Sequence, residues 1–218
     1  MGNIIRITGK GELSLRPDLT VINFTIKMLK PTYKESADYG TALLEHLTNK
    51  LESLGIDKDE LKTESFNIKA MHRYEGTDNK EYVFKGYYYD QRMILEINRD
   101  AELLNKILNI LATTLHAPDI EISYSIKDKE AAKNMMLEKA VKDAKEKARI
   151  ITVASGVELG RIVNIDYSYS KFEFAVSPYE YRSLKCATMN SMDEDICLDI
   201  NPEDIKVSDS VTIAFEIK

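Results

Sequence analysis

Two closely spaced glycines near the start of the chain, in ITGKGELSLRPD, could allow a phosphate group to approach the backbone. A dinucleotide site needs G-x-G-x-x-G between a strand and a helix, so that the helix N-terminus faces the pyrophosphate. Here Gly9 and Gly11 are followed by Ser14 at the third position, and the next residues alternate like a strand. The motif therefore predicts no nucleotide site; it predicts a glycine bulge or a close backbone approach in a sheet.

Residues that could bind a metal are scattered. The chain has three histidines, His46, His72 and His116. They lie in three different predicted elements, without the short spacings that zinc sites use. One acidic run superficially resembles a calcium loop, and its members are Asp193, Glu194, Asp195 and Asp199. It lacks the glycine and the glutamate that a calcium loop needs, so we predict a solvated loop and no metal site.

Nucleophilic chemistry has no recognisable signature either. The chain has no G-x-S-x-G turn, and neither Cys186 nor Cys197 has a histidine nearby in sequence. A disulfide between these cysteines would close only a short local loop, so we expect two thiols in a reducing compartment. We predict no catalytic residue and no cofactor.

Tyrosine is frequent, with 12 in the chain. Seven of them are adjacent to or alternate with another tyrosine in the sequence: Tyr87, Tyr88, Tyr89, Tyr167, Tyr169, Tyr179 and Tyr181. Three consecutive tyrosines cannot all be buried on one side of a strand, and tyrosine offers a large contact area with a polar tip. This favours a protein interface, with a carbohydrate or small-ligand platform as the alternative.

Charge and hydropathy exclude several classes. The net charge is −6, and basic residues are mixed with acidic ones along the chain, which argues against a nucleic-acid surface. The N-terminal residues contain no apolar run typical of a signal peptide or a membrane span. We therefore expect a cytoplasmic protein, or a periplasmic one if a leader peptide has been removed.

Period-two alternation predicts most of the strands that must position these residues. It is found in 19–29, 120–126, 163–169 and 211–217, which read as one-sided antiparallel strands. Residues 61–97 read as a long hairpin that turns at EGTDNKE, with Met93, Leu95 and Ile97 pointing inward.

Three helices have readable ends. The first begins at a capping box of Thr32 and Glu35 and ends at Gly55, and the second runs from an Asp100 cap to a stop before Pro118. The third, about 129–155, is long and rich in alanine. Its predicted buried stripe is Ala132, Met136, Ala140, Ala144, Ala148 and Ile151. Small residues on this stripe predict a close approach to a sheet or to another helix.

The predicted order is ββαββαβαββ, an α+β fold with a largely antiparallel sheet. Residues 170–204 show no sustained period, and we expect an irregular insertion or loop there. We expect a single domain over 1–218, with two α+β subdomains as the alternative.

Two stretches together resemble the SIMPL domain family. The opening stretch matches through Gly9, Gly11, Pro17 and Asp18. The alanine-rich helix matches through Ala132, Ala140, Ala144 and Ala148, followed by Gly156, Leu159 and Gly160. The closing PEDIKVSDSVTIAFEIK is similar to the family's terminal strand.

The resemblance implies a domain of unknown function without established catalytic residues. Bacterial members are often exported, with links to oxidative stress and surface antigens, some form ring-like or channel-like oligomers, and a mammalian relative is a partner of a signalling kinase. We therefore expect a non-enzymatic homo-oligomer or protein-interaction module, with subunit contacts from sheet edges and residues 170–204. The alternatives are a small-ligand-binding protein, with a pocket between the long hairpin and the alanine-rich helix, and an enzyme with an unrecognised site.

Overall fold

The computed structural model describes residues 3–75, 81–115, 118–167, 174–180 and 200–218. Its helices are α1 (Tyr33–Glu52), the short 3₁₀ helix η1 (Lys58–Glu60), α2 (Ala101–Thr114) and α3 (Lys129–Ala154). Its strands are β1 (Ile4–Leu15), β2 (Leu19–Lys30), β3 (Leu61–Glu75), β4 (Glu81–Asn98), β5 (Asp119–Ser125), β6 (Leu159–Asp166), β7 (Ala175–Glu180) and β8 (Ile205–Ile217). The predicted α+β class is confirmed.

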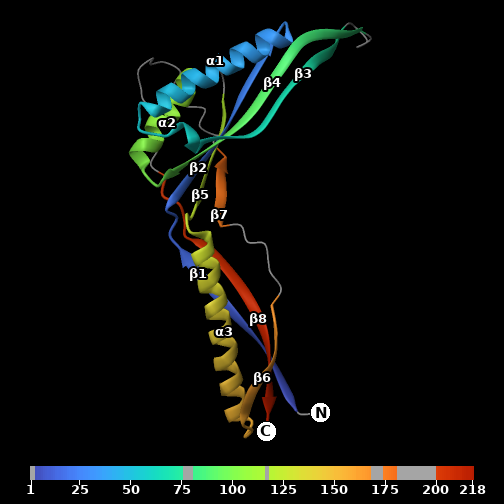
Figure 1. The fold of residues 1–218 in the computed structure, drawn as a ribbon, viewed down its shortest axis with the longest axis vertical. Helices are drawn as coiled ribbons and strands as arrows, with labels where there is room; N and C mark the ends of the chain where they lie inside the picture. The colour runs from blue at the N-terminus through green and yellow to red at the C-terminus, as the bar shows by residue number, and fades with distance from the viewer. Residues whose placement is uncertain (1–2, 76–80, 116–117, 168–173, 181–199) are drawn as a thin grey trace. The chain divides into compact units, whose positions relative to one another are not determined.

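The chain divides into two compact units, each with its own sheet. Unit 1 comprises 1–18, 125–176 and 202–218, and its sheet has the order β1-β8-β6. Unit 2 comprises 19–124 and 177–201, and its sheet has the order β3-β4-β2-β5-β7. Figure 1 shows α3 beside the sheet of unit 1, and α1 and α2 beside that of unit 2.

In unit 1, α3 packs against β1 and β8 through a stripe of residues spaced four apart. The buried members are Ala132, Met136, Ala140, Ala144, Ala148 and Thr152. The prediction that Ile151 belongs to this stripe is wrong, because Ile151 is 42% exposed. The four-residue spacing turns Thr152 inward instead, and its hydroxyl donates to the Ala148 carbonyl at 2.9 Å.

Gly9 and Gly11 bring β1 close to this helix. A Cβ on Gly9 would clash with the Ala140 carbonyl oxygen, and one on Gly11 would clash with that of Met136. Strand β1 pairs with β8 from Ile4 to Leu15 without a register shift, so there is no bulge at the glycines. Of the two structural roles predicted for them, close backbone approach is the one observed.

In unit 2, one face of the sheet forms a core with α1 and α2. Residues buried in this core include Ile22, Phe24, Met93, Leu95, Ile107, Leu108 and Leu111. The predicted caps are confirmed: the Glu35 amide donates to the Thr32 hydroxyl at 3.2 Å, and Asp100 accepts from two amides at the start of α2. The inward positions of Met93, Leu95 and Ile97 in the hairpin are also confirmed.

A strand was predicted over 163–169; β6 spans Leu159–Asp166 and covers the first part of that range, and the predicted one-sided burial is wrong. Val163 and Ile165 are each 54% exposed, and Tyr167, just past the strand, is 37% exposed. The reason is that β6 is an edge strand, while α3 lies mainly over β1 and β8.

The prediction that residues 170–204 are irregular is wrong in part, because strand β7 lies inside this segment. It occupies the edge of the sheet of unit 2, next to β5. An edge strand does not need every N–H group, so Pro178 is tolerated there. The rest of the segment, apart from Phe174 and residues 200–204, lies outside the described residues.

Candidate functional site

The histidines lie on separate elements. His46 is exposed on α1, His72 is exposed on β3, and His116 lies outside the described residues. Within the described ranges, no three His, Cys, Asp or Glu side chains are placed to hold a metal ion.

Several other candidate residues lie in parts of the chain that the structure does not describe. Cys186 and Cys197 lie outside the described residues, as do all four members of the acidic run, Asp193, Glu194, Asp195 and Asp199. Their predicted roles, two thiols and a solvated loop, stay predictions.

The three consecutive tyrosines face opposite sides of β4. Tyr89 is buried at 3% exposure, and its hydroxyl donates to the Gln91 side chain. Burial raises the pKa of the Tyr89 hydroxyl. Tyr87 and Tyr88 are half-buried, and the Lys69 ammonium lies 5.9 Å from the Tyr88 ring.

None of the other tyrosines singled out in the sequence is described next to Tyr87, Tyr88 and Tyr89. The Tyr167 hydroxyl donates to Asp209 at 2.9 Å in unit 1. Tyr169 and Tyr181 lie outside the described residues, as does the side chain of Tyr179.

The end of the hairpin forms a two-stranded ribbon beyond the rest of the sheet. Strand β2 pairs with β4 only as far as Lys30, which lies opposite Tyr87. Residues 81–86 of β4 and 71–75 of β3 therefore continue without β2 beside them, and the hairpin extends past the start of α1 in Figure 1. We call these residues the ribbon.

Gly86 marks the point where the ribbon begins. Its φ of +131° favours glycine, and a Cβ there would clash with the Lys30 carbonyl oxygen. The β3–β4 register shifts here as well, between Met71 and His72. A bulge of this kind bends and twists the strands, so Gly86 sets the direction of the ribbon.

Aromatic rings cover one face of the ribbon. His72 stacks on Tyr82 with ring centroids 4.6 Å apart, and it meets Phe84 edge-on at 5.4 Å. Tyr74 lies 4.9 Å from Tyr82. We call these four residues the aromatic cluster. Phe84 connects it to Tyr87, whose ring meets that of Tyr33 at the start of α1.

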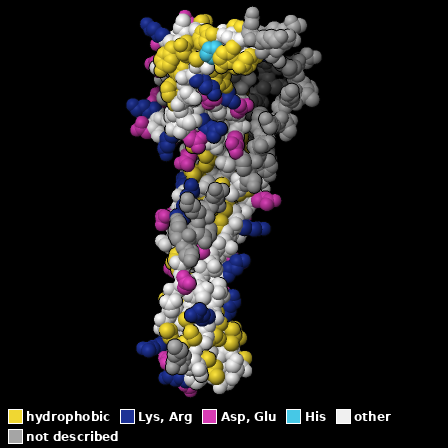
Figure 2. Space-filling view, turned by 90° about the vertical axis from the view of Figure 1, so that its right-hand side faces the viewer, with side chains coloured by type: hydrophobic (Ala, Val, Ile, Leu, Met, Phe, Trp, Pro, Cys, Tyr) yellow, Lys and Arg dark blue, Asp and Glu magenta, His cyan; other side chains and the backbone are white. Residues whose placement is uncertain are grey.

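The aromatic cluster is open to solvent. Tyr74 is 59% exposed, Tyr82 61% and Phe84 46%. Figure 2 shows hydrophobic side chains gathered over this part of the molecule. Aromatic rings held together on the surface are typical of protein interfaces.

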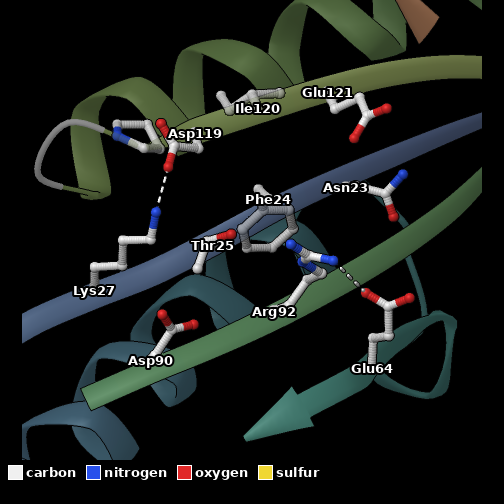
Figure 3. Close-up of a pocket in the computed structure, with 11 residues that line it drawn as sticks. Asn23, Phe24, Thr25, Lys27, Glu64, Asp90, Arg92, Asp119, Ile120 and Glu121 are labelled. Carbon is white, nitrogen blue, oxygen red and sulfur yellow. Dashed lines mark hydrogen bonds and ion pairs between the residues drawn. The ribbon is translucent and has the colours of Figure 1, made fainter. Parts of the chain in front are cut away.

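A polar cavity lies on the other face of the sheet of unit 2. Its volume is about 530 Å³. The charged side chains that line it are Lys27, Glu64, Asp90, Arg92, Asp119 and Glu121. They come from neighbouring strands, and Figure 3 shows Lys27 pointing toward Asp119 and Arg92 pointing toward Glu64. The cavity lies within unit 2, so it is not the predicted pocket between the hairpin and the alanine-rich helix.

Ion pairs occupy part of this cavity. Lys27 donates to Asp119, and this hydrogen bond raises the pKa of the Lys27 ammonium. Arg92 contacts Glu64 at 3.4 Å. Carboxylates outnumber cations in the lining, so the cavity suits a cationic group better than an anionic one.

Unit 1 has an exposed apolar surface of its own. It is formed by residues of β6 and of the end of α3, which are Ile150, Ile151, Val153, Leu159, Ile162, Val163 and Ile165. Val153 is the most exposed of these, at 70%. We call it the β6 surface.

None of the helices in the described ranges is long and apolar enough to cross a membrane.

The chain combines two antiparallel sheets with a glycine-x-glycine strand held against an alanine-rich helix, and this combination defines the class of fold. Residues 5–215 match the family SIMPL, described as "Protein of unknown function (DUF541)". The chain therefore belongs to the SIMPL family, which confirms the resemblance.

Two curated relatives cover almost the whole chain. Both are called "26 kDa periplasmic immunogenic protein", one from Brucella melitensis biotype 1 and one from Brucella abortus strain S19. Each is 24% identical over 217 residues, which is 98% of this chain and 84% of the relative.

Proposed function

We propose that this protein is a non-enzymatic, self-associating module, and that the aromatic cluster takes part in its subunit contacts. The observation that carries the proposal is the exposure of Tyr74 and Tyr82, two neighbouring rings of which more than half is open to solvent. Aromatic rings of this kind are enriched at the centres of interfaces, where their burial contributes most of the binding energy.

The form of the ribbon supports the same proposal. A two-stranded ribbon on its own is only marginally stable in water, and a third strand or a packed layer stabilises it. Residues 71–75 and 81–86 have no third strand beside them among the described residues. A second subunit would supply that layer.

The β6 surface supports self-association from unit 1. Edge strands with exposed apolar side chains are prone to pair with other chains, and natural proteins usually cover or charge them. Here Val163 and Ile165 are uncovered in the isolated subunit. We place the β6 surface among the subunit contacts, and we regard 1–218 as one SIMPL domain built from the two units.

The name of the Brucella relatives leads us to propose a periplasmic location, in place of the reducing, cytoplasmic one expected from the sequence. Cell fractionation of the native host, with antibody against this chain, tests it. Recovery with periplasmic markers is expected, whereas recovery with cytoplasmic markers would contradict it.

Light scattering coupled to size exclusion tests self-association. We expect a mass above that of the 24.9 kDa subunit at micromolar concentration. A strict monomer over that range would contradict the proposal.

A small-ligand-binding function is the second candidate, because the polar cavity of unit 2 offers converging charged groups. Asp90 and Glu121 make the lining acidic, which favours a small organic polycation. Calorimetric titration with spermidine tests this, and the variant Asp90→Asn with Glu121→Gln is the control. Saturable binding that the double variant weakens is expected; no heat at millimolar spermidine would rule out this ligand class.

A further inference from the structure

We propose that two copies of the chain pair edge to edge through β3, antiparallel and centred on Ala70, so that their sheets become continuous. This inference rests on the proposed self-association and specifies its surface and register. The occupant of the free edge is a second copy of this chain.

The edge of β3 that faces away from β4 is open to pairing with another strand. Strand β3 ends the order β3-β4-β2-β5-β7, and no other strand in the described part of the chain pairs with its outer side. It extends from Leu61 to Glu75 and contains no proline. The outward N–H and C=O groups of such a strand must bond to water or to another strand.

The regular part of β3 fixes the length of the pairing. The register with β4 shifts between Thr63 and Ser65, so that Glu64 is an extra residue on β3. The second shift, between Met71 and His72, places its extra residue on β4. Strand β3 is therefore regular from Ser65 to Glu75, and Ala70 is its midpoint.

Symmetry then determines which residues meet. A two-fold axis perpendicular to the sheet keeps the same face of the sheet on the same side in both copies. With the axis at Ala70, Phe66 lies opposite Tyr74 of the second copy, and Ile68 lies opposite its His72. These residues share the face that carries Tyr87 and Tyr89, since Ala70 pairs with Tyr87 and Ile68 pairs with Tyr89.

The pairs formed in this register are complementary. Phe66 and Tyr74 are 56% and 59% exposed in the single subunit, and each would be covered by the other. Cross-strand pairs of aromatic residues stabilise antiparallel sheets. On the opposite face, Lys69 meets Met71 and Asn67 meets Arg73, so no like charges lie directly opposite each other.

The neighbouring registers are less suitable. An axis at Lys69 places two lysine side chains directly opposite each other, which destabilises a sheet. An axis at Ile68 limits regular pairing to residues 65–71 and brings Tyr74 opposite Lys62, beyond the extra residue at Glu64.

Disulfide trapping tests the register. In a background with Cys186→Ser and Cys197→Ser, Ala70→Cys places two thiols opposite each other. Opposed Cα atoms in an antiparallel pair lie about 4.5 to 5.5 Å apart, within the range of a disulfide. We expect Ala70→Cys to form a covalent dimer on the order of a hundredfold faster than Lys69→Cys, because pairing raises the local thiol concentration. A variant that carries both Lys69→Cys and Met71→Cys should also form a covalent dimer, because residue 69 of one copy lies opposite residue 71 of the other. Circular dichroism verifies that each variant is folded.

The outcomes separate this inference from the proposed function. Faster trapping through Ile68→Cys than through Ala70→Cys would overturn the register. A self-associating wild type whose hairpin variants all fail to cross-link would overturn pairing through β3 and leave self-association standing. A monomeric wild type would overturn the proposed function itself.

Discussion

The His72 ring lies flat on the Tyr82 ring, with 4.6 Å between centroids and 10° between planes. His72 is directly opposite Phe84, so this stack runs diagonally across the ribbon. Contact between the two rings restricts the rotamers that each side chain can adopt, while both side chains remain exposed. A partner that docks here therefore has less side-chain entropy to remove, which favours binding.

Gly9→Ala is expected to destabilise unit 1. The new methyl group would clash with the Ala140 carbonyl, and the backbones of β1 and α3 would have to separate. Overpacking of this kind costs about 1 to 3 kcal/mol of the free energy of unfolding. Urea unfolding measures this loss. The control is Lys10→Ala, which removes an exposed side chain and should cost much less; equal losses would contradict the role of Gly9.

Gly86→Ala is expected to distort the ribbon and weaken self-association. The variant combines a left-handed φ with a clash against the Lys30 carbonyl. Gly55→Ala is a matched control, because Gly55 also has a positive φ, of +83°, while its Cβ would meet no atom within 4 Å. Both variants should lose about 1 kcal/mol or more from backbone strain. Sedimentation velocity should show weaker association for Gly86→Ala alone, and unchanged association would contradict the role of Gly86.

Asp143 should make the stability of unit 1 depend on pH. Its carboxylate accepts from the Lys147 ammonium and from the Lys10 amide, both at 2.7 Å, and these bonds lower its pKa. Since the folded-state pKa is below the unfolded value of about 4, the stabilisation is present above that pH and is lost as pH falls through the folded-state pKa.

Melting temperatures at pH 7 and pH 2 check this prediction. Asp143→Asn should melt below the wild type at pH 7 and close to it at pH 2. Glu138→Gln, which removes an exposed pairing at 3.7 Å to Lys142, should change the melting temperature little at either pH. A difference in melting temperature between Asp143→Asn and the wild type that persists at pH 2 would contradict the role of the ionised Asp143 carboxylate.

Much of the fold could be predicted from the sequence because local signals determine it. The caps at Thr32 and Asp100 and the alternation in β2 depend only on neighbouring residues. Burial at β6 could not be predicted, because the alternation of Val163 and Ile165 is the same whether or not a helix covers that face. Strand β7 was missed because backbone pairing at an edge requires no side-chain period.

The aromatic cluster was missed for a different reason. Tyr87, Tyr88 and Tyr89 stand out because they are adjacent in sequence, whereas the exposed rings are brought together by the hairpin. One signal was available: Tyr74 and Tyr82 lie at equal distances from the predicted turn, so a hairpin had to pair them. The charged cavity had no such signal, because its side chains come from separate strands whose order the sequence does not specify.

Sedimentation equilibrium of the double variant Tyr74→Ser with Tyr82→Ser tests whether the aromatic cluster lies in the subunit contact. Removal of the two rings should lower the association constant about tenfold or more, because aromatic residues contribute most of the binding energy of such contacts. Tyr39→Ser is the matched control, because Tyr39 is 49% exposed on α1 and is not part of the cluster. We expect weak association for the double variant and wild-type association for the control. Equal association of all three proteins, each folded by circular dichroism, would contradict this expectation.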